Sequence, residues 1–80
     1  MEQNKTEDAV DYYLKAANID RNEMTTPIAL MKAGKAYEEL GKFAEAVGMY
    51  EQIRNEFPES NEGKEIDKYI AYAKVKAGIE

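Results

Sequence analysis

The chain has 80 residues and a net charge of −5, with 44% hydrophobic and 34% charged residues. It has no cysteine or histidine and a single serine, Ser60, so disulfides, thiolate chemistry and Ser-His-Asp catalysis are excluded, and we expect no catalytic residue, metal or cofactor. The acidic balance argues against nucleic-acid binding, and no apolar run reaches the roughly 20 residues of a membrane span. The apolar content predicts one folded unit rather than a disordered tail.

The first predicted helix runs from about Glu7 to Ile19. Thr6 is a good N-cap, and acidic side chains follow it in the first turn, where the helix dipole favours negative charge. Five residues fall on one face at helical spacing and are predicted to be buried: Ala9, Val10, Tyr13, Ala16 and Ala17.

The second predicted helix starts at Thr26-Pro27, where Thr26 is the expected cap and proline suits the first helical position. Gly41 is predicted to end it in a left-handed conformation. Its buried stripe is predicted to contain Leu30, Ala33, Gly34, Tyr37 and Leu40.

The third predicted helix runs from about Phe43 to Glu56 and stops before Pro58, because proline disfavours helix at the preceding residue. The short link at Gly41-Lys42 predicts an antiparallel hairpin with the second helix. Ser60 or Asn61 is expected to cap a fourth helix that ends near Ala77-Gly78. The predicted buried residues are Phe43, Ala46, Val47, Tyr50 and Ile53 in the third helix and Ile66, Tyr69, Ile70 and Ala73 in the fourth.

The first and third helices share a sequence pattern. Asp8 to Tyr13 and Glu45 to Tyr50 both have the order acid-Ala-Val-x-x-Tyr, at an offset of 37 residues. They are therefore predicted to be the same element of two successive repeats.

The pattern between the second and third helices resembles the tetratricopeptide repeat, a helix-turn-helix repeat of about 34 residues. The matching positions are Leu30, Ala33-Gly34, Tyr37, Gly41, Phe43, Ala46, Tyr50 and Pro58. Leu30 replaces the usual tryptophan and Ile53 replaces a second alanine, and both keep an apolar contact. Gly34 and Ala46 are expected to allow the close helix crossing.

The resemblance implies an all-α fold of antiparallel helix-turn-helix repeats, forming the end of a right-handed solenoid with four helices. We expect a single unit over residues 1–80: the second helix of a truncated repeat at 6–20, one complete repeat at 27–60, and a capping helix at 61–78. The segment from Asn55 to Ser60 also resembles bacterial cell-envelope repeat proteins, so the C-terminal portion of a bacterial repeat protein is expected, in the cytoplasm or the envelope.

Members of this family usually bind a protein or peptide in a concave groove, which predicts scaffolding by protein binding and no enzyme activity. Carried over by position, the groove residues are Ile28, Met31, Lys35, Glu38, Glu39, Glu65, Tyr69 and Tyr72. A structural reading stands beside this, in which Tyr69 packs in the core and Lys35 pairs with Glu39 on the surface.

The first helix suggests an alternative function. Its apolar residues predict packing on both sides, although the chain supplies a neighbour on one side, and the face consists of Val10, Tyr13, Leu14 and Ala17. Either the remainder of a longer array covers this face, or two copies cover each other as a homodimer.

Overall fold

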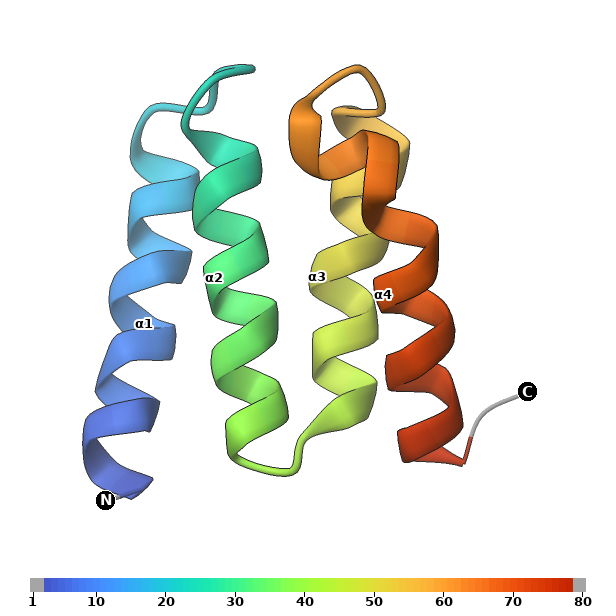
Figure 1. Ribbon diagram of the computed structural model, residues 1–80. Helices are drawn as coiled ribbons and strands as arrows, with labels where there is room; N and C mark the ends of the chain where they lie inside the picture. The colour runs from blue at the N-terminus through green and yellow to red at the C-terminus, as the bar shows by residue number, and fades with distance from the viewer. Residues whose placement is uncertain (1–2, 79–80) are drawn as a thin grey trace.

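The computed structural model describes residues 3–78, which form four helices. In chain order these are α1 (Gln3–Ile19), α2 (Thr26–Glu39), α3 (Phe43–Glu56) and α4 (Asn61–Ala77). Figure 1 shows them side by side, alternating in direction, in a flat molecule of 31 × 29 × 14 Å. Each helix contacts the next, and α2 also contacts α4. The all-α prediction is confirmed.

The core lies between α2, α3 and α4, with one contribution from α1. Its largest side chain is Tyr50, which is fully buried and faces Gly34 across the α2–α3 crossing. A Cβ atom at Gly34 would lie 2.4 Å from the Tyr50 ring, so glycine is required for the helices to approach this closely. The other fully buried members include Ala17, Leu30, Ala46, Ile53, Ile66 and Ala73.

The turn between α2 and α3 follows the prediction. Gly41 has φ +76°, a left-handed conformation that favours glycine, and the Lys42 amide donates a hydrogen bond of 2.9 Å to the carbonyl of Tyr37. α3 then begins at Phe43, as expected from the two-residue link. These two helices form the antiparallel hairpin.

Ser60 is the N-cap of α4, which decides between the two predicted caps. Its hydroxyl accepts a hydrogen bond of 2.9 Å from the Gly63 amide and donates one of 2.7 Å to the carbonyl of Phe57. Gly63 packs against the same turn, because a Cβ atom there would lie 2.2 Å from the Phe57 carbonyl oxygen. The requirement for glycine at this position was not predicted.

Three predictions about α1 and the start of α2 are wrong. Thr6 lies inside α1, which begins at Gln3, so it does not act as the N-cap. Ala16 is exposed because it faces away from α2, the helix that α1 contacts. Thr26 is the first residue of α2 rather than its cap.

The hydroxyl of Thr26 instead fastens the α1–α2 connection. It accepts a hydrogen bond of 2.8 Å from the Asn22 amide and lies 3.5 Å from the carbonyl oxygen of Ala17, to which it donates. The Asn22 side chain in turn accepts from the amides of Met24 and Thr25. Thr26 is fully buried, so these bonds satisfy a polar group that would be costly to leave unpaired.

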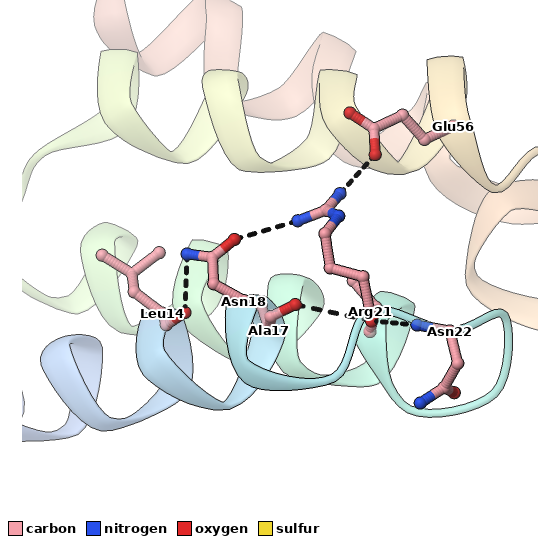
Figure 2. A network of polar contacts seen from close by, with 7 residues as sticks. Leu14, Ala17, Asn18, Arg21, Asn22 and Glu56 are labelled. Carbon is pink, nitrogen blue, oxygen red and sulfur yellow. Dashed lines mark hydrogen bonds and ion pairs between the residues drawn. The ribbon is translucent and has the colours of Figure 1, made fainter.

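The same connection reaches α3 through Arg21. Figure 2 shows the guanidinium of Arg21 pointing from the end of α1 to the carboxylate of Glu56, with which it forms an ion pair and a hydrogen bond. Arg21 also donates to Asn18, whose side-chain amide donates to the carbonyl of Leu14. These bonds link the C-terminal ends of α1 and α3, two helices that α2 otherwise separates.

Candidate functional site

The described residues contain no cluster of three or more potential metal ligands, and no buried side-chain nitrogen or oxygen lacks a hydrogen-bond partner. No helix in the described part of the chain is long and apolar enough to cross a membrane. Among the titratable groups of residues 3–78, the one with a clearly shifted pKa is Tyr50. Burial, followed by its 2.8 Å hydrogen bond to Glu38, raises the pKa of its phenol far above the ordinary value. This is the signature of a core tyrosine rather than of a catalytic base.

The predicted groove residues lie on α2 and α4, the two non-consecutive helices that contact each other. Six of them have side chains that reach solvent with no core hydrogen bond, and we call this set the α2–α4 surface. It consists of Ile28, Met31, Lys35, Glu39, Glu65 and Tyr72.

The other two predicted groove residues have structural contacts. Glu38 is half-buried and accepts the hydrogen bond from the Tyr50 hydroxyl. Tyr69 is half-buried against the core, with its ring centroid 5.8 Å from that of Tyr50. The core role considered for Tyr69 therefore agrees with its position.

Lys35 joins the two helices of the α2–α4 surface. Its ammonium nitrogen lies 4.6 Å from the centre of the Tyr69 ring, and that of Lys68 lies 5.5 Å from the same ring. Both distances are within the range of a cation–π interaction. The expected surface pair of Lys35 with Glu39 is thus replaced by a contact to α4.

Two further members of the surface have neighbours on α4. Glu65 forms an exposed ion pair with Lys68 at 3.6 Å, and Tyr72, 52% exposed, lies beneath the ammonium of Lys76. Near the start of α2, Ile28 is 44% exposed. The surface therefore presents an apolar residue at each end, with charged groups between them.

The predicted face of the first helix has a different composition in the structure. Val10 and Ala17 are 4% and 0% exposed, so they pack inside the chain and are not available to a partner. Tyr13 and Leu14 are half-buried and reach the surface. The correction follows from α2, which covers the side of α1 on which Val10 and Ala17 lie.

A cleft between α1 and α2 was not predicted. It has a volume of about 310 Å³ and opens to solvent beside Tyr13, whose ring has the ammonium of Lys32 over it at 5.9 Å. We call it the α1–α2 cleft, and its lining consists of Lys5, Thr6, Ala9, Tyr13, Lys32, Lys35, Ala36 and Glu39. Sequence spacing gives no signal for it, because its lysines come from two helices.

Comparison with known proteins gives one match. A family model described as tetratricopeptide repeat matches residues 28–60, a range that includes nearly all of α2, the Gly41 turn and all of α3. No curated protein and no solved structure gives a match.

Proposed function

We propose that this chain, in which a tetratricopeptide repeat model matches residues 28–60, is a scaffolding module that binds a partner protein or peptide through the α2–α4 surface. Tetratricopeptide repeats are in general protein–protein interaction modules. Within the described residues no group of three or more side chains is placed to hold a metal ion.

The observation that carries the proposal is the contact of Lys35 with Tyr69. It holds a charged side chain of α2 against a ring of α4, so that the two helices present one continuous surface. Long side chains that are already ordered lose less entropy when a partner binds. Ile28 and Tyr72, partly exposed apolar residues, provide contacts that would be desolvated by a bound chain.

The test is to select binding peptides from a random display library and to map the tightest one by amide chemical shifts of the isotope-labelled chain. We expect the largest shift changes at Ile28, Lys35 and Tyr72. The substitution Ile28→Glu should weaken binding about tenfold or more, which corresponds to about 1.4 kcal/mol. Ile19→Glu, the same change at an exposed residue at the end of α1, is the matched control. Shifts confined to the outer sides of α1 and α3, or equal losses in both variants, would contradict the proposal.

A second function, self-association through α1, is favoured by a different observation. In α1, Tyr13 is half-buried and Ala16 is exposed. Their counterparts in α3, Tyr50 and Ile53, are both fully buried. An apolar face of a repeat that lacks its neighbour is a surface on which a second copy could pack.

Light scattering over a range of concentrations tests this second function. If it is correct, the chain is a dimer that Tyr13→Lys dissociates, while Tyr72→Lys on α4 leaves it intact. A monomer at every concentration excludes self-association and leaves the α2–α4 surface as the site to examine.

A further inference from the structure

Helix α2 contacts the buried Tyr50 of α3 through two of its residues. Gly34 lies against the face of the Tyr50 ring, and Glu38, one turn later, accepts the hydrogen bond from its hydroxyl at 2.8 Å. Residues four apart lie on the same face of a helix, so one small residue and one carboxylate meet the ring together. Tyr69 of the following helix lies beside the same ring.

Tyr13 is the counterpart of Tyr50 at the 37-residue offset, and it has no such helix over it among the described residues. It remains half-buried at the edge of the α1–α2 cleft. Ala9 and Ala36 form apolar lining beside it, and Lys32 lies over the ring from the following helix, the place that Tyr69 has beside Tyr50. The cleft thus repeats the environment of Tyr50, except for the covering helix.

The charges at this cleft are opposite to those of the chain. Three lysines, Lys5, Lys32 and Lys35, line it against one acid, Glu39, in a protein with 16 acidic and 11 basic residues. Two other clefts among the described residues show the contrast. One, at the Met24 and Phe57 loops, has three glutamates and no lysine or arginine, and the other, beside Val10 and Leu40, has two acids and one lysine.

We propose that the α1–α2 cleft binds an acidic amphipathic helix of a partner protein, with glycine or alanine placed over Tyr13 and a glutamate four residues later. The glutamate would accept the hydrogen bond of the Tyr13 hydroxyl, as Glu38 does for Tyr50, and further acids would face Lys5 and Lys32. This inference rests on the proposed function and names the class of partner for the part of the surface near Lys35 and Glu39. It uses the helix-in-groove mode of recognition.

The α2 helix of a second copy is a poor occupant of this cleft. It has the Gly34–Glu38 pair, but it carries Lys32 and Lys35, and its Gly34 is already covered by Tyr50. Its lysines would meet a lysine-lined cleft, where like charges repel.

The chain supplies its own probe for the test. A fluorescein-labelled peptide with the sequence of residues 25–41 and the substitutions Lys32→Glu and Lys35→Glu keeps the Gly34–Glu38 pair and reverses the unfavourable charges. We expect saturable binding to the full 80-residue chain by fluorescence anisotropy, weakening as salt is raised. The peptide with unaltered lysines, and the peptide with Gly34→Leu, should each bind at least tenfold more weakly.

Variants of the protein locate the site. Lys5→Glu with Lys32→Glu should weaken binding about tenfold, since each exposed ion pair contributes about 0.2–1 kcal/mol and the new acids repel those of the peptide. Lys15→Glu with Lys64→Glu makes the same change of charge at exposed positions outside the cleft and should leave affinity within a factor of two. Circular dichroism verifies that each variant is folded.

Three results would overturn the inference: no saturable binding to the folded chain, equal weakening by the control pair, or equal binding of the unaltered lysine peptide. Burial of Tyr13 in a dimer of the free chain would assign the cleft to a second copy instead. If display-selected peptides bind the α2–α4 surface while the acidic peptide fails, this inference alone is wrong and the proposed function stands.

Discussion

Helices α1 and α3 share a sequence pattern and differ in their surroundings. Ala46, Tyr50 and Ile53 of α3 are fully buried, whereas their counterparts in α1, Ala9, Tyr13 and Ala16, are partly or wholly exposed. The reason is that α3 lies between α2 and α4, while α1 contacts α2 alone within residues 3–78. The repeat pattern therefore specifies which residues face a neighbour, but burial depends on whether the neighbour is there.

The largest expected difference is between the two tyrosines. Tyr50→Ala should lower the free energy of unfolding by about 3–5 kcal/mol, because it removes a fully buried aromatic ring and leaves a cavity. Tyr13→Ala should lower it by about 1 kcal/mol, since its half-buried ring leaves a gap that water fills. Urea unfolding followed by circular dichroism measures both values, and equal losses would mean that α1 is as enclosed as α3.

The next effect tests why Tyr50 is enclosed. Gly34→Ala should destabilise the chain by about 1–3 kcal/mol, because the added methyl group overlaps the Tyr50 ring. In a Tyr50→Ala background the overlap is absent, and the same change should stabilise by up to about 1 kcal/mol through helix propensity. Urea unfolding of the four proteins of this double-mutant cycle gives the coupling, and additive effects would show that the ring and the glycine are not in contact.

The pH dependence of stability should report on Tyr50, the enclosed tyrosine of α3. Burial and the Glu38 hydrogen bond raise the pKa of Tyr50 in the folded state, so this group contributes stability that is constant below the unfolded pKa of about 10 and is lost as pH rises above it. The loss attributable to Tyr50 should approach about 1.4 kcal/mol per pH unit. Unfolding measured at alkaline pH should show a smaller slope for Tyr50→Phe than for the unaltered chain, and equal slopes would mean that Tyr50 does not cause the loss.

The smallest effect concerns the outer side of α3, where Gly48 corresponds to the exposed Asp11 of α1. Nothing lies within 4 Å of a Cβ atom built at Gly48, which excludes the close helix approach that its glycine suggests. Gly48→Ala should therefore raise the thermal midpoint, with a gain of up to about 1 kcal/mol. Gly41→Ala, at φ +76°, should lower the midpoint by a comparable amount, so a loss in both variants would indicate an unseen contact at Gly48.

The sequence predicts the features that depend on local rules. The left-handed Gly41 and the bounds of α3 follow from turn and helix chemistry within a few residues, and the structure has them. Gly63 was missed because its neighbour is a carbonyl of the Phe57 turn, whose path depends on how Pro58 leads into α4. Thr26 was misassigned because its hydroxyl bonds to Asn22 in the α1–α2 connection instead of capping α2. The offset of 37 residues is three more than the family period of about 34.

The candidate site is less predictable than the fold for the same physical reason. The eight predicted groove residues lie on α2 and α4, and two of them, Glu38 and Tyr69, have core contacts that the sequence does not separate from a groove role. The contact of Lys35 with Tyr69 and the convergence of Lys5 on Lys32 depend on the distance between helices and on the reach of long side chains. Helical periodicity contains neither quantity.

The flat arrangement of the helices has a consequence for the order in which the chain opens and closes. Contacts between helices join successive elements, apart from those of α2 with α4, so few of them require distant segments to meet. Chains with such local contacts fold in microseconds to milliseconds. α2 contacts all three other helices and should hold its amide hydrogens longest in deuterated water, whereas α1, supported on one side, should exchange first. Helix α1, which forms one wall of the α1–α2 cleft, is thus the first to detach. A partner bound in the cleft would slow the exchange of α1 more than that of any other helix.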